Sequence, residues 1–134
     1  MEFMKFINKE LPLHKDIKIE LTDIKDSDMT TGVRKKRHNI KVLYKQRMLV
    51  DVLRTIGHEW VHEFQHQKGL VKGSKKYPNI GGWVENEANA LSGAILKKFV
   101  KNHKNLEEIL YWISNIYKKE GKHEKNNKIE WIWP

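Results

Sequence analysis

Residues 58–66 read His58-Glu59-Trp60-Val61-His62-Glu63-Phe64-Gln65-His66. Within this stretch His58, Glu59 and His62 form the pattern H-E-x-x-H. On an α-helix, side chains four positions apart lie on one face, so the two imidazoles can bind the same metal ion while the glutamate stands beside them. The pattern is typical of zinc-dependent peptide hydrolases, in which this glutamate is the general base.

The same pattern occurs a second time, in the overlapping residues 62–66. A metal-binding helix needs apolar surroundings near its ligands. The first copy encloses an apolar Trp-Val pair, whereas the second encloses Phe-Gln and runs into a polar helix end. We therefore predict that His58 and His62 are the metal ligands and that Glu59 is the catalytic carboxylate.

A catalytic zinc site has three protein ligands and one open position for water, so a third ligand must come from elsewhere. A second helix is predicted after the glycine pair at residues 81–82, and Glu85 and Glu87 lie in its first turns. Either carboxylate can complete a His-His-Glu ligand set. The predicted apolar stripe of this helix consists of Val84, Ala88, Leu91, Ile95 and Phe99.

Two motifs follow each other in the chain. H-E-x-x-H-x-x-x-H fills residues 58–66, and Glu87-Ala88-Asn89-Ala90 begins 25 residues after His62. In this combination the chain resembles the ImmA/IrrE-type metallopeptidases, over roughly residues 38–100. The resemblance implies a small, gluzincin-like zincin fold of the α+β class, with a strand directly before the motif helix.

The resemblance also implies that His58, His62 and Glu87 bind one Zn²⁺ ion and that Glu59 is the catalytic carboxylate. A metal-activated water would then attack a peptide bond, and Glu59 would pass the water's proton to the leaving amine. The implied activity is that of an endopeptidase that makes limited cuts in a regulatory protein. Stabilising the oxyanion needs a further donor, and the sequence offers Tyr77, His103, Tyr111, Tyr117 and His66.

The pattern of the whole chain predicts one zincin-like domain at residues 1–134, with a core at 15–120 and a loose tail at 121–134. The tail ends in an apolar stretch, residues 129–134, that can tie back onto the domain. The predicted fold is a short, mainly antiparallel sheet packed on three to four helices. Its predicted elements are helices at 2–11, 45–68, 82–100 and near 105–119, and strands at 17–21 and 39–44. We expect strand 39–44 to be the exposed edge that a substrate could join.

Composition narrows the class of protein. The chain has no cysteine, so a zinc ion must be held by nitrogen and oxygen ligands. It shows no apolar run of membrane-spanning length and no signal peptide, and we predict a cytoplasmic protein without a membrane partner.

The net charge is +9, and residues 34–82 hold 12 basic and three acidic residues. Such a field attracts acidic or nucleic-acid-associated protein substrates, without implying sequence-specific recognition of nucleic acid. The alternative to the enzyme is a basic, nucleic-acid-associated binding module with a structural zinc ion. That reading requires a fourth protein ligand, for which His66 or Glu85 is the candidate.

Overall fold

The computed structural model describes residues 2–23, 30–35, 38–71, 82–102 and 128–133. Within these ranges the elements are α1 (Glu2–Glu10), β1 (Ile17–Thr22), β2 (Gly32–Lys35), β3 (Asn39–Leu43), α2 (Leu49–Gln67), α3 (Trp83–Asn102) and β4 (Lys128–Trp133). Helices and strands are thus mixed along the chain, and the predicted α+β class is confirmed. The helix predicted near residues 105–119 lies outside the described residues.

The four strands form one sheet in the order β2-β3-β1-β4. β2 and β4 run antiparallel to their neighbours, whereas β1 and β3 are parallel. The sheet is therefore mainly antiparallel, as predicted. The prediction that residues 39–44 form its exposed edge is wrong, because β3 is hydrogen-bonded to β2 on one side and to β1 on the other. The edge on that side is β2.

The chain outside the expected core also belongs to the domain. β4 pairs with all six residues of β1, from Ile17↔Trp133 to Thr22↔Lys128. The prediction of a loose tail at 121–134 is therefore wrong for residues 128–133. The expectation that the end of the chain ties back onto the domain is confirmed. At the other terminus α1 buries Phe3, Met4 and Ile7, so the core begins before residue 15.

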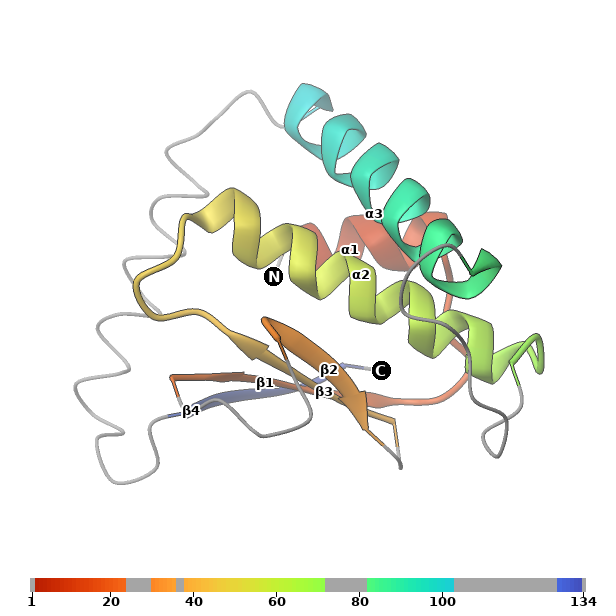
Figure 1. Ribbon diagram of the computed structural model, residues 1–134, viewed down its shortest axis with the longest axis horizontal. Helices are drawn as coiled ribbons and strands as arrows, with labels where there is room; N and C mark the ends of the chain where they lie inside the picture. The colour runs from red at the N-terminus through yellow and green to blue at the C-terminus, as the bar shows by residue number, and fades with distance from the viewer. Residues whose placement is uncertain (1, 24–29, 36–37, 72–81, 103–127, 134) are drawn as a thin grey trace.

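The three helices lie on one face of the sheet, and α2 runs between the sheet and α3 (Figure 1). This central position explains why α2 is buried almost all round, with Ile56, Trp60 and Val61 fully enclosed. The helix begins at Leu49, later than the predicted residue 45. None of the helices in the described ranges is long and apolar enough to cross a lipid bilayer.

A glycine sets the distance between the two longest helices. A Cβ atom built on Gly57 of α2 would lie 3.3 Å from the Cβ atom of Ser92 on α3. Because both atoms are attached directly to helix backbones, neither can move aside without moving its helix. Gly57 therefore lets α3 approach α2 closely, directly beside His58.

Candidate metal centre

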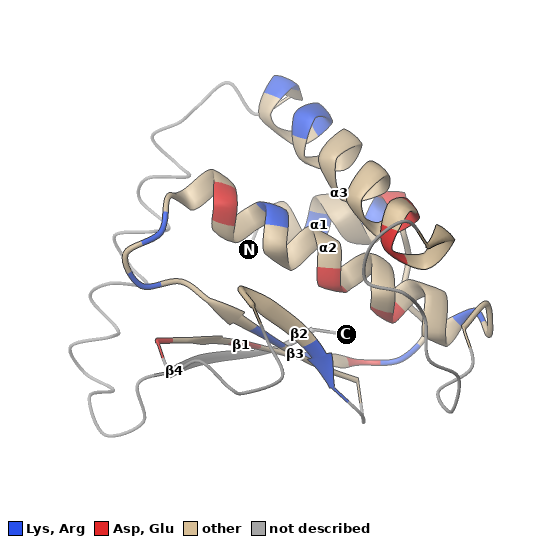
Figure 2. Cartoon of the chain, viewed as in Figure 1, with Lys and Arg blue, Asp and Glu red and all other residues tan. Residues whose placement is uncertain are grey.

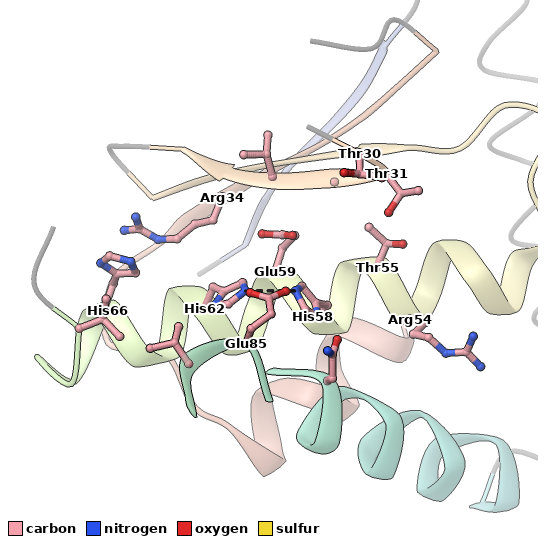
Figure 3. A pocket seen from close by; sticks show the side chains of 15 residues that line it. Thr30, Thr31, Arg34, Arg54, Thr55, His58, Glu59, His62, His66 and Glu85 are labelled. Carbon is pink, nitrogen blue, oxygen red and sulfur yellow. Dashed lines mark hydrogen bonds and ion pairs between the residues drawn. The ribbon is translucent and has the colours of Figure 1, made fainter. Parts of the chain in front are cut away.

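Two turns of α2 present a pair of histidines to one point. The Nε2 atoms of His58 and His62 lie 3.1 Å apart, and the two rings are nearly perpendicular, at 82°. Glu85 reaches them from the first turn of α3 (Figure 3). Its Oε1 lies 2.7 Å from His58 Nε2, and its Oε2 lies 3.1 Å from His62 Nε2.

The geometry of these three side chains fits a single divalent ion. One ligand atom from each of His58, His62 and Glu85 lies within 4.8 Å of the others. Metal–ligand bonds of about 2.0–2.1 Å in a tetrahedral site place ligand atoms about 3.3 Å apart, close to the separations seen here. Two imidazole nitrogens and a carboxylate are donors that suit Zn²⁺. Among the described residues, this is the group of histidines and acids that could hold a metal ion.

The family resemblance implied Glu87 as the third residue of the cluster. In the structure Glu85 occupies this position instead. Residues two apart on a helix project about 200° from each other, so their side chains cannot reach the same point between the two histidines. Glu87 instead accepts a hydrogen bond from Gln65 Nε2 at 3.1 Å. The close contact between Gly57 and Ser92 sets the rotation of α3 that favours Glu85.

Both histidines have further partners that hold their rings. The side chain of Asn89, one turn after Glu85, hydrogen-bonds His58. His62 Nδ1 lies 3.0 Å from Oε1 of the fully buried Gln65. Burial lowers the pKa of His58, and His62 lowers it further, although Glu85 and Asn89 act in the opposite direction. Nothing in the sequence pattern marks Gln65 as a partner of a histidine in the cluster.

Glu59 is placed beside the cluster and points toward β2 (Figure 3). Its side chain is 7% exposed, and the backbone N–H of Arg34 donates a hydrogen bond to it. Burial raises the pKa of Glu59 to about 8, the charge of Glu85 adds to this rise, and Arg34 opposes it. A carboxylate with one backbone donor and a raised pKa takes up a proton readily.

The second copy of the histidine motif is used differently. Glu63 is fully buried and accepts hydrogen bonds from Arg34 Nε at 2.9 Å and Gln67 Nε2 at 2.8 Å. His38 Nδ1 lies 2.7 Å from Glu63 Oε2, the oxygen that also accepts the hydrogen bond from Gln67. His66 is not part of the three-residue cluster, and burial and Arg34 lower its pKa. The two histidines of the first copy thus converge with Glu85, whereas Glu63 of the second copy belongs to a buried ion-pair network.

A cleft of about 630 Å³ lies between β2 on one side and α2 and α3 on the other. His58, Glu59, His62 and Glu85 line it at its middle (Figure 3). Gly32 lets β2 lie this close to α2, because a Cβ atom there would collide with Thr55 Cγ2. The cleft is also lined by Thr30, Thr31, Gly32, Val33, Arg34, Arg54, Thr55, His66, Val71, Val84 and Asn89.

Of the residues considered as oxyanion donors, His66 lines the cleft. The others, Tyr77, His103, Tyr111 and Tyr117, lie outside the described residues. No protein-family model, no characterised protein and no solved structure matches this chain. The functional interpretation therefore rests on the residues and their geometry.

Proposed function

We propose that this protein is a zinc-dependent endopeptidase of the ImmA/IrrE-like type. One observation carries the proposal: His58, His62 and Glu85 converge from two helices on one point, next to a buried Glu59, in an open cleft. This is the ligand set of a catalytic zinc site, with a carboxylate placed for proton transfer. The proposed ligand set contains Glu85 in place of Glu87.

The chain's own residues have distinct tasks in this proposal. A bound zinc ion supplies a Lewis acid that polarises the peptide carbonyl and acidifies an attacking water. Glu59 accepts the proton of the water and donates it to the leaving amine. The Arg34 N–H donates a hydrogen bond to the Glu59 carboxylate, which lines the cleft. Glu59 is 7% exposed, so little solvent competes for its carboxylate, which strengthens its electrostatic interactions.

The position of the edge strand β2 is consistent with a peptide as the substrate. β2 pairs with β3 on one side and borders the cleft on the other, so its outer edge is open to an extended chain within the described residues. A peptide added there would lie across Glu59. Basic residues occupy β2 (Figure 2), and Arg54 lines the same cleft. These charges favour acidic segments, such as an exposed loop of a regulatory protein.

The alternative of a structural zinc ion makes a different demand on the site. A structural site is closed by four protein ligands. The cluster contains three among the residues that the structure describes, and His66 is not one of them. The geometry therefore favours the enzyme over the binding module.

Zinc content and peptide hydrolysis, measured together, test the proposal. The wild-type chain should bind one equivalent of Zn²⁺ and cleave internal bonds in a mixture of proteome-derived peptides, read by mass spectrometry. Glu59→Gln should retain the zinc and lose at least about 100-fold in cleavage rate, because the general base is removed. Equal cleavage by wild type and variant would refute the assigned base, and absence of zinc binding would refute the site.

A further inference from the structure

Gln65 is an amide in the interior of the protein, with an exposed fraction of 0%. Its Nε2 donates hydrogen bonds to the carbonyl oxygen of Val84 and to Glu87 Oε1, both at 3.1 Å. Its Oε1 lies 3.0 Å from His62 Nδ1. Burying an amide without hydrogen-bond partners costs free energy of folding. These three contacts offset that cost and so allow a glutamine at this buried position.

The contacts also fix which way the amide points. The Val84 carbonyl and the Glu87 carboxylate accept hydrogen bonds, so the NH₂ group of Gln65 must face them. Its carbonyl oxygen then faces His62, and a carbonyl oxygen can only accept. The proton of the neutral His62 ring therefore belongs on Nδ1, which leaves the lone pair of Nε2 free.

Nε2 of His62, the ring nitrogen with the available lone pair, is the one that faces the other residues of the cluster. His62 Nε2 lies 3.1 Å from His58 Nε2 and 3.1 Å from Glu85 Oε2. The same glutamine holds the carbonyl of Val84, the residue before Glu85, against α2. One side chain thus controls the tautomer of one ligand and the approach of the helix turn that carries another.

We propose that Gln65 is a positioning residue of the metal site and that Glu87 acts through it by orienting its amide. The inference rests on the proposed zinc site and deepens it, since it gives Glu87 a role outside the ligand set. Partners of this kind hold a ligand ring and strengthen its binding to the metal.

The test is the Zn²⁺ affinity of variants, measured by competition with a chromophoric chelator. Gln65→Leu should bind Zn²⁺ about 10- to 100-fold more weakly than wild type, because His62 loses its acceptor. Gln67→Leu is the matched control, since it removes a glutamine of the same helix that bonds Glu63 and the Lys15 backbone. It should leave the zinc affinity within about threefold of wild type. Glu87→Gln should do the same, because the introduced amide still offers an acceptor oxygen.

A paired exchange separates positioning from general damage to the fold. Gln65→Glu keeps an acceptor for His62 but sets a second carboxylate against Glu87 and the Val84 carbonyl, and should weaken zinc binding because this repulsion displaces the turn that carries Glu85. The double variant Gln65→Glu/Glu87→Gln restores an N–H donor between the two side chains but not one to the Val84 carbonyl, and should recover part of the affinity lost in Gln65→Glu. Nitrogen-15 NMR of the metal-free protein should show His62 protonated at Nδ1 in wild type and a mixture of tautomers in Gln65→Leu.

The outcomes distinguish this inference from the function it rests on. If wild type binds no zinc, the proposed site and the inference fall together. If wild type binds zinc and folded Gln65→Leu binds it equally well, the positioning role alone is overturned. A large loss in Glu87→Gln without recovery in the double variant would also overturn it, because Glu87 would then act as a ligand. If Gln65→Leu fails to fold, the comparison of Gln65→Glu with the double variant decides.

Discussion

At the scale of single residues, Glu59 is held where its charge is disfavoured. It is 7% exposed, faces the charge of Glu85, and has the backbone N–H of Arg34 as a compensating donor. Such an environment is found where a carboxylate must exchange protons, and it costs stability when the group is ionised. Ionised Glu59 therefore lowers the free energy of unfolding of the protein.

The pH dependence of stability follows from this position. The pKa of Glu59 is raised from 4.5 to about 8, so between these values the unfolded chain has lost a proton that the folded one keeps. Stability of the metal-free protein should fall as pH rises through this window, and Glu59→Gln should remove that fall. At pH 7 the variant should be more stable by on the order of 3 kcal/mol. Urea unfolding in the presence of a chelator measures this, and parallel pH profiles would contradict the assignment.

The residues of the site differ in how far the sequence could place them. His58, Glu59 and His62 lie within five positions of one helix, so helical geometry alone brings them together. Glu85 depends on how α3 is rotated against α2. The predicted stripe included Leu91, which is half-buried, whereas Ser92 and Leu96 are buried in its place. Gly57, next to His58, is the signal that could have revealed a contact with a small residue.

At the scale of elements, β2 is fastened to α2 by one residue. Arg34 binds Glu63 through its side chain and Glu59 through its backbone, and the two glutamates are one helical turn apart. The side chains of Arg34 and Glu63 are 16% and 0% exposed. A buried ion pair thus ties the edge strand, which is also paired with β3, to α2.

Removing the Arg34 side chain should loosen the contact between β2 and α2. Arg34→Ala leaves the Glu63 carboxylate with His38 and Gln67, and should destabilise the protein by about 3 kcal/mol. Hydrogen exchange of the β2 amides should speed up more than that of the β1 amides. Lys98→Ala is the control, because it breaks an exposed pair with Glu10 and should cost below about 1 kcal/mol. Equal protection of β2 in Arg34→Ala and wild type would contradict this role.

The contact between α2 and α3 can be tested with two glycines. Gly57→Val forces a side chain against Ser92, and should lower stability by about 1–3 kcal/mol and weaken zinc binding. Gly93→Val makes the same change in helix propensity at a position with nothing within 4 Å. Thermal unfolding and zinc titration of both variants separate the effect of crowding against Ser92 from the effect of helix propensity. Similar effects of the two changes would show that the close approach does not matter.

The sequence predicted the helices and the strands β1 and β3 because their apolar residues repeat with a clear period. β2 escaped prediction for the opposite reason. It has four residues, Gly32-Val33-Arg34-Lys35, and a single large apolar side chain. Its place in the sheet comes from pairing with β3 and from the ion pair to Glu63, both of which are tertiary contacts.

At the scale of the whole molecule, α2 is enclosed by the sheet below and α3 above (Figure 1). The sheet is completed by β4, which comes from the far end of the sequence and covers the backbone edge of β1. An uncovered edge would leave a row of unpaired backbone groups. Residues 128–133 therefore belong to the fold, although their distance in sequence and the charged segment before them suggested a tail.

A shortened chain tests this closure. A variant that ends at residue 127 loses the six-residue pairing with β1 and should be less stable by about 2–4 kcal/mol, with a greater tendency to aggregate. A variant that ends at residue 133 keeps β4 and serves as the control. Thermal unfolding and light scattering measure both properties. Equal unfolding midpoints for the two chains would show that β4 contributes nothing to the domain.

The measurement that bears most directly on the whole account is the position of zinc in a crystal of the zinc-loaded protein, found from anomalous scattering at the zinc edge. We expect one peak, bonded to Nε2 of His58 and His62 and to the Glu85 carboxylate at about 2.0–2.2 Å, with a fourth position open to solvent. A peak bonded to Glu87, a fourth protein ligand that closes the site, or no peak between the two histidines would contradict it.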